Sequence, residues 1–163
     1  MAGALQVDLA FVPAADFRPL AGSFRLIFGH AREHRHVPPP PAATLIGMGW
    51  LYALHARSAL GRHKLWQAEY MISGVRDHAL ALACLRHGLA AVHGRGIDEL
   101  PDEVTAPFEG SLVGQLEIGG LSRAFVAAVA GLQGEIERAA PEIAKGLEEP
   151  LKALTESAAE FSA

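Results

Sequence analysis

Acidic, aromatic and basic side chains recur at helical spacing along one stretch of the chain, from Lys64 to Gly88. Apolar residues three or four positions apart predict one long helix whose seam faces a core, formed by Leu65, Ala68, Ile72, Val75, Ala79 and Leu82. A second stripe, rotated away from this seam, consists of Trp66, Glu69, Tyr70, Ser73, Arg76 and Asp77. Such a stripe is either a solvated face or the wall of a cleft.

Two features of this second stripe favour the wall of a cleft. Trp66 and Tyr70 carry large rings that are costly to leave in water. The helix is also apolar all round from Ala79 to Leu85, which predicts that its second half is buried on every side. The single cysteine, Cys84, lies in this half, and we expect it to be a small core residue rather than a nucleophile.

Asp8 is a second candidate for chemistry, because it lies in the middle of the alternating segment Leu5–Phe11. The alternation predicts a strand that ends before Pro13. A carboxylate held on a rigid sheet is typical of the Mg²⁺ sites of phosphoryl-transfer enzymes. An edge strand with Asp8 in solvent is the alternative, and the spacing alone does not decide between the two.

The same strand raises a question of stability. A single strand with an apolar face is not independently stable, and Phe24–Phe28 offers one more short segment at best. We therefore expect the strand to pair either with strands that this sequence lacks or with another molecule.

Composition narrows the classes of protein. Half of the 163 residues are apolar, which is enough for a sizeable core, and the net charge is −4. With 14 basic residues and no strong cluster of them, a dedicated nucleic-acid surface is not expected. No apolar run is long enough for a signal sequence or a membrane span. One cysteine cannot form a disulfide within the chain, which fits the cytoplasm.

Four prolines, Pro38–Pro41, form a polyproline spacer and the clearest boundary. The predicted fold is mainly α: a five-helix bundle over residues 42–158, preceded in residues 1–37 by a remnant strand, or two, of an α/β sheet. Helices are predicted from Pro41 to Gly61, from Lys64 to Gly88, from Pro101, from Leu121 to Ala140 after a break at Gly119 and Gly120, and from Pro141 with a kink at Pro150.

The run LWQAEYMISGVRDHALALACLRHGL, followed by HGRGIDELPDEV, resembles the helical C-terminal domain of bacterial nucleotidyltransferases. These belong to the DNA-polymerase-β-like superfamily, which includes the aminoglycoside and lincosamide nucleotidyltransferases. LQVDLAFVPAADFRP resembles the segment with their third catalytic carboxylate, and the likeness extends from Leu5 to about Leu154. It implies an N-terminal sheet in which a Gly-Ser turn, an Asp-x-Asp pair and a third aspartate bind two Mg²⁺ ions and a nucleoside triphosphate.

The resemblance puts Asp8 in the position of the third, metal-binding aspartate. This sequence departs from the family in having no Gly-Ser turn followed by Asp-x-Asp. We therefore expect that the first part of the sheet is missing and that the chain is inactive alone.

The resemblance also implies roles for the long helix, which would supply the acceptor side of the cleft. Glu69 would hold or deprotonate the acceptor hydroxyl. Trp66 and Tyr70 would offer flat apolar contact to a sugar or ring.

The resemblance also implies roles for the charged residues near this cleft. Arg76 and Asp77 would orient the helix or the substrate; an internal ion pair with Arg57 or Glu69 is the alternative. Arg57 is assigned to the substrate-binding side. Arg95 would reach the triphosphate, although a solvated turn residue between two glycines is the alternative.

The leading hypothesis is thus a fragment of a nucleotidyltransferase that moves a nucleoside monophosphate to a small hydroxylated acceptor. A non-catalytic helical binding or dimerisation module is the alternative, with the strand covered by a second copy or by a separate polypeptide. A third possibility is an RNA-cleaving helical domain that uses Arg57 with His63, or Arg86 with His93.

Overall fold

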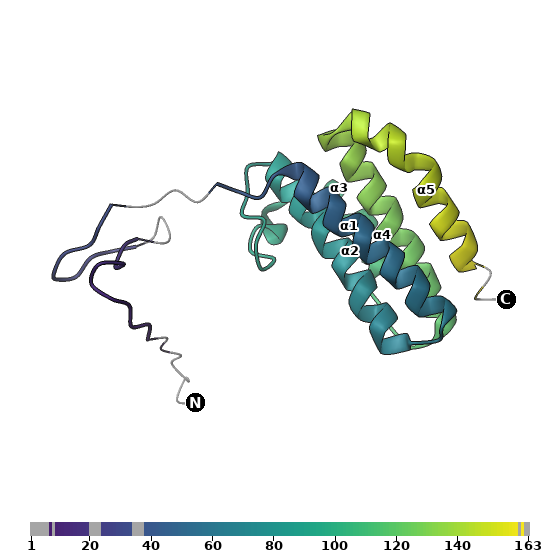
Figure 1. The fold of residues 1–163 in the computed structure, drawn as a ribbon, viewed down its shortest axis with the longest axis horizontal. Helices are drawn as coiled ribbons and strands as arrows, with labels where there is room; N and C mark the ends of the chain where they lie inside the picture. The colour runs from purple at the N-terminus through teal and green to yellow at the C-terminus, as the bar shows by residue number, and fades with distance from the viewer. Residues whose placement is uncertain (1–6, 8, 20–23, 34–37, 160, 162–163) are drawn as a thin grey trace. The chain divides into compact units, whose positions relative to one another are not determined.

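The computed structural model describes residues 7, 9–19, 24–33, 38–159 and 161. The chain divides into two compact units, Met1–Pro38 and Pro39–Ala163, so the division falls at the first of the four prolines. Every helix of the described residues lies in the second unit (Figure 1). The prediction of a mainly α fold with five helices is confirmed.

The first unit has turns but no regular element among its described residues. The Asp16 backbone N–H donates to the Pro13 carbonyl at 2.8 Å, and the Phe17 and Phe24 rings meet edge to face. Val7 and Leu9–Phe11 form no strand, while Leu5, Gln6 and Asp8 lie outside the described residues. The predicted strand is therefore unconfirmed. Leu9 and Phe11 are 77% and 93% exposed, as expected for an apolar segment without a sheet to join.

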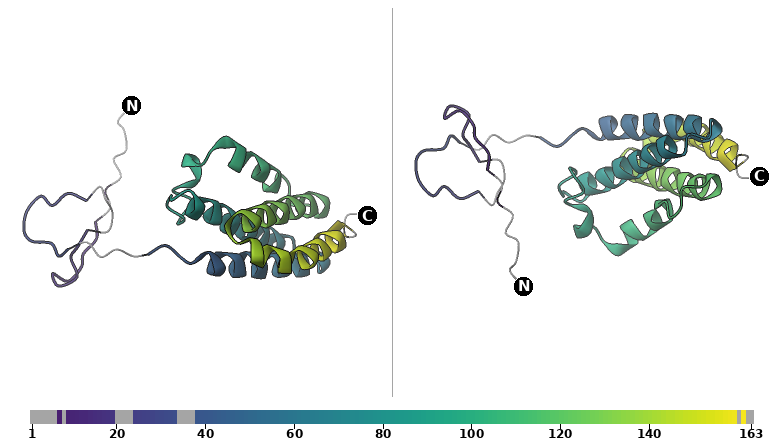
Figure 2. Two further views of the ribbon diagram at one scale, coloured as in Figure 1. Left: turned by 90° about the horizontal axis from the view of Figure 1, so that it is seen from above. Right: turned by 90° about the horizontal axis from the view of Figure 1, so that it is seen from below.

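The first two helices, α1 (Ala42–Gly61) and α2 (Leu65–Arg86), form an antiparallel hairpin, visible in both views of Figure 2. A glycine allows one close approach between them. A Cβ on Gly74 would lie 2.2 Å from the Tyr52 ring, so the ring of α1 sits directly on the backbone of α2. The predicted seam of α2 is buried except at Leu65, which is half-buried, and most of Ala79–Leu85 is buried as well, so the core-facing role of this helix is confirmed.

The bundle is completed by α4 (Ile118–Ala139) and α5 (Pro141–Ala159), which carry Phe125, Leu132, Ile136 and Leu151 into the core. α4 begins three residues earlier than predicted, and Gly119 and Gly120 lie in its first turn. That position tolerates glycine because the first N–H groups of a helix have no partner within it. α5 continues through Pro150.

The third helix is shorter than predicted. After a single 3₁₀ turn, η1 (Ile97–Glu99), the chain forms α3 (Asp102–Thr105) and continues as the 3₁₀ helix η2 (Ala106–Ser111). Pro107 has no N–H to donate, so it cannot extend the α-helix. Phe108 of η2 is buried against α4. In the described ranges, none of the helices combines the length and the apolar character that a membrane crossing requires.

Candidate functional site

The outer stripe of α2 is where the sequence predicted a cleft wall. Trp66, Tyr70, Ser73 and Asp77 follow one another at helical spacing along it. Trp66 and Tyr70 are 78% and 62% exposed, so in this chain both rings lie on open surface. Trp66 lines a hollow near the start of α2 that does not include Asp77.

Aromatic rings connect the middle of this stripe to α1. The Tyr52 ring lies 6.4 Å from the Tyr70 ring and 5.1 Å from the His78 imidazole, measured between centroids. Hydrogen bonding with Tyr70 raises the pKa of Tyr52 above its usual value, and burial adds to the shift. The Tyr52 phenol is therefore a neutral donor at physiological pH.

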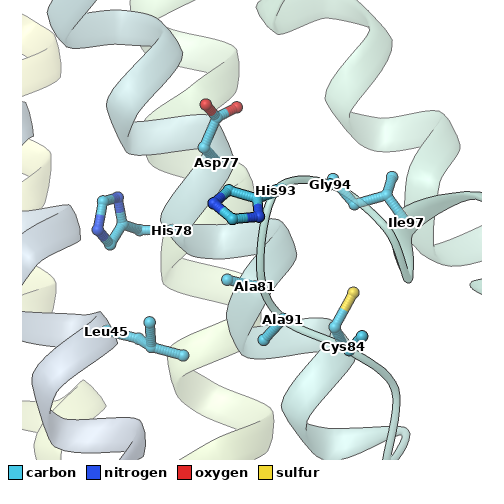
Figure 3. A pocket seen from close by; sticks show the side chains of 10 residues that line it. Leu45, Asp77, His78, Ala81, Cys84, Ala91, His93, Gly94 and Ile97 are labelled. Atoms are coloured by element: carbon cyan, nitrogen blue, oxygen red, sulfur yellow. The ribbon is translucent and has the colours of Figure 1, made fainter. Parts of the chain in front are cut away.

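Beyond Asp77 the stripe enters a pocket of about 410 Å³. Asp77, Ala81 and Cys84 line it from α2, with spacings of four and three, and Leu45 lines it from α1. The segment after α2 closes the other side with His93, Gly94 and Ile97 (Figure 3). The pocket is thus the continuation of the stripe, roofed by a loop.

This roof, residues 89–97, is held by backbone bonds to α2 and to itself. The Leu89 N–H donates to the Cys84 carbonyl at 2.8 Å, and the Gly96 N–H donates to the Ala90 carbonyl at 3.1 Å. A Cβ on Gly96 would lie 2.6 Å from that same carbonyl oxygen, so the turn requires glycine there. His93, with φ of +55°, is in the left-handed region and stands on the pocket rim.

The polar groups of the pocket can serve as donors and acceptors. His78 Nδ1 is 2.8 Å from the Gly74 carbonyl, so this nitrogen carries the proton and a neutral ring offers Nε2 as an acceptor. Asp77 is largely exposed, and its Oδ1 is 3.3 Å from Arg76 Nη2. The arrangement suits the binding of hydroxyl groups.

Cys84 is at the base of the pocket and fully buried. Burial raises the pKa of the Cys84 thiol, and the nearby Glu99 carboxylate raises it further. A thiol held in its protonated form is a poor nucleophile. This agrees with its predicted role as a core residue.

The remaining predicted residues occupy different places. Glu69 is half-buried and accepts a hydrogen bond from Ser73 Oγ at 2.9 Å, within its own helix. Arg57 Nε donates to Ser157 Oγ of α5 at 2.6 Å, and Asp77 forms an ion pair with Arg76 rather than with Arg57, the partner named in the alternative. Arg95 is exposed in the turn of the roof, and it is not among the pocket's lining residues.

In both residue pairs of the RNA-cleaving hypothesis, the arginine is hydrogen-bonded to a residue other than its proposed histidine partner. Arg86 bonds to the Glu135 carboxylate of α4, whereas His93 lines the Asp77 pocket. Arg57 is engaged with Ser157, and His63 lies in the short connection before α2.

The pocket includes two histidines that the sequence argument did not assign to it. His78 follows Asp77 directly, and its position facing α1 could have been read from the helical wheel. His93 reaches the pocket only because the roof folds back over α2, and no periodicity encodes that return.

For metals, the described residues contain no group of three or more histidine, cysteine, aspartate or glutamate side chains placed to bind an ion. Asp8, the residue expected to bind Mg²⁺, lies outside them. Comparisons of the chain with protein-family models, with curated proteins and with solved structures each gave no match.

Proposed function

We propose that the helical unit binds a small hydroxylated molecule along the outer stripe of α2, as the acceptor side of a nucleotidyltransferase. The observation that carries the proposal is that the stripe from Tyr70 to Asp77 ends in a pocket with a carboxylate and two imidazoles on its walls. Side chains of this kind recognise hydroxyl groups, and tyrosine rings pack on the apolar faces of sugars.

The spacing along the helix limits the size of the ligand. Tyr70 and Asp77 are seven residues apart, or about 10 Å at the rise of an α-helix. A single sugar ring does not span this distance, but two linked rings do. Trp66, four residues further, is about 16 Å from Asp77 along the helix axis and would contact only a longer ligand.

Within this proposal Glu69 is the candidate general base. It lies next to Tyr70 on the helix, and its hydrogen bond from Ser73 holds the carboxylate in place. Mg²⁺ and a nucleoside triphosphate would be the cofactors that the resemblance implies. Transfer would be a metal-assisted in-line attack by the acceptor hydroxyl on the α-phosphate, with pyrophosphate leaving.

The binding part of the proposal is tested with sugars of one, two and three rings. We expect maltose and maltotriose, but not glucose, to shift the backbone amide NMR signals of Asp77, His78 and His93. Asp77→Asn should weaken maltotriose binding roughly tenfold, the loss of a charged hydrogen bond. Asp98→Asn, exposed on η1, is the matched control. Shifts absent from this region with all three sugars would refute the proposed site.

The catalytic part is tested separately by incubating the chain with ATP, Mg²⁺ and maltotriose. Two Mg²⁺ ions need more carboxylates than Asp8 alone provides, so we expect no pyrophosphate release by this chain. Release that is abolished by Glu69→Gln would show that the chain is an enzyme by itself.

A non-catalytic dimerisation module is the second candidate, favoured by one observation. Trp66 is 78% exposed on the helical unit, and exposed tryptophans are enriched at protein interfaces. Light scattering between 10 and 200 µM, on the order of typical weak dimer affinities, distinguishes this role. A dimer that Trp66→Ala disperses would support it, and a monomer at every concentration would exclude it.

A further inference from the structure

We propose a second binding site, for a small organic acid with an apolar body, in a pocket separate from Asp77. The pocket has a volume of about 460 Å³ and lies between the end of α2, the α3–η2 segment and α4. One end is formed by two guanidinium groups, and the other by the backbone and small side chains of α4.

The charged end is organised by Glu135, whose side chain is only 2% exposed. Arg86 Nη2 lies 3.2 Å from one carboxylate oxygen of Glu135, and Arg138 Nη1 lies 3.0 Å from the other. A buried carboxylate that holds two arginines fixes their orientation before any ligand arrives.

The two guanidiniums keep donors for a ligand. Arg138 contacts Glu135 through Nη1, and its Nε and Nη2 make no hydrogen bond within the described part of the chain. Two arginines against one buried carboxylate leave one positive charge in this cluster, which the exposed Glu103 carboxylate on the pocket's lining offsets in part. A ligand carboxylate matches the planar donor pattern of a guanidinium.

The apolar end explains why an organic acid is favoured over a bare ion. Phe108 packs on α4 where Gly131 leaves space: a Cβ there would lie 2.3 Å from the ring. Ala127, Ala130 and Gly134 extend this floor, with helical spacings that put them on one face of α4. A short alkyl chain or single ring on the floor would bury apolar surface while its carboxylate meets the arginines.

One charge on the pocket disfavours an anion, and the two arginines have an alternative, structural role. Glu103 of α3 also lines the pocket and repels an anion, although it is exposed to solvent. Arg86 and Arg138 lie in the last turns of α2 and α4, where positive charge also stabilises the helix ends. A purely structural role for the arginines predicts no ligand binding, so the experiment separates the two.

The test uses 3-phenylpropanoate and its neutral amide with the full chain, followed by NMR of the backbone and arginine Nε signals. We expect the acid to shift Gly131, Gly134 and Arg138, and the amide to bind at least tenfold more weakly. Arg138→Gln, at a largely exposed side chain, should weaken binding of the acid by roughly tenfold. Lys152→Gln, exposed on α5, is the matched control.

A second variant leaves both arginines, and so the local structure around Glu135, unchanged. Glu103→Gln removes a like charge from the rim and should strengthen binding of the acid roughly two- to threefold, an effect of partly screened charges. Equal binding of acid and amide, or inorganic phosphate competing fully with the acid, would overturn the proposed ligand class. Absence of any shift at millimolar acid would overturn the site.

Discussion

Gly74 lies in the middle of α2, where a glycine ordinarily weakens a helix relative to alanine. Its value here is the space that it gives to the Tyr52 ring, which carries the aromatic connection from α1 to Tyr70 and His78. The residue therefore fixes both the hairpin and the middle of the candidate site.

We predict that Gly74→Ala destabilises the chain by about 1–2 kcal/mol, because overpacking outweighs the gain in helix propensity. Urea unfolding followed by circular dichroism measures the change. Gly47→Ala is the control, since a Cβ on Gly47 of α1 would meet no atom within 4 Å. The free energy of unfolding of that variant should rise by about 0.5–1 kcal/mol. Equal effects of the two substitutions would show that Tyr52 does not depend on Gly74.

Cys84 makes the stability of the folded chain fall with rising pH in the alkaline range. Burial raises its pKa in the folded chain, so folding favours the protonated thiol. This contribution is complete below the usual thiol pKa, near 8.5, and is lost as pH rises above it, by up to about 1.4 kcal/mol per pH unit. We predict a falling urea midpoint between about pH 8 and 9.5, below the range where Tyr52 titrates. The fall should flatten in Cys84→Ala; an unchanged slope would assign it to another group.

At the level of elements, periodicity predicted what depends on local pattern. The bounds of α1 and α2 follow from Pro41, Gly61 and the apolar seam, and the structure agrees within two residues at either end. The α3–η2 segment was predicted less well, because a single proline, Pro107, converts one helix into two short ones. The strand predicted at Leu5–Phe11 stays unconfirmed: alternation is a property of the segment itself, but pairing depends on neighbouring strands.

For the candidate site, too, the sequence could predict the part that depends on local pattern and not the part that depends on the loop. Asp77 and the stripe could be predicted because they are spaced along one helix. The pocket could not, since its roof is set by left-handed residues and by the close approach of Gly96 to Ala90.

The roof provides a prediction of its own. In Gly96→Ala the new Cβ would clash with the Ala90 carbonyl, so residues 89–97 must rearrange. We expect Cys84 to react with a disulfide reagent on the order of tenfold faster, which corresponds to about 1.4 kcal/mol easier local opening. Gly114→Ala, in a loop where a Cβ meets nothing within 4 Å, should leave the rate unchanged. Equal rates in both variants would mean that the roof does not control access.

For the whole molecule, the division at Pro38 predicts independent folding. In the part of the chain that the structure describes, every buried residue of the hydrophobic core lies between Leu45 and Ala158, inside the second unit. A chain of residues 39–163 should therefore unfold within about 2 °C of the full chain in calorimetry, since a loss of 1 kcal/mol would shift the midpoint by more. A midpoint lower by 10 °C or more, far outside that margin, would show that the first unit stabilises the helices.

Small residues take part in the packing of α1 and α2: Ala53, Ala56, Ala68 and Ala79 are fully buried, and Gly74 lies directly under the Tyr52 ring. Methyl groups have no rotamers to exchange, so the hairpin cannot adapt its shape at these alanines by moving side chains. Any guest larger than the pocket must be admitted by residues 89–97 giving way. Selectivity at Asp77 would then be governed by how readily one nine-residue loop lifts, while the two helices act as a fixed template.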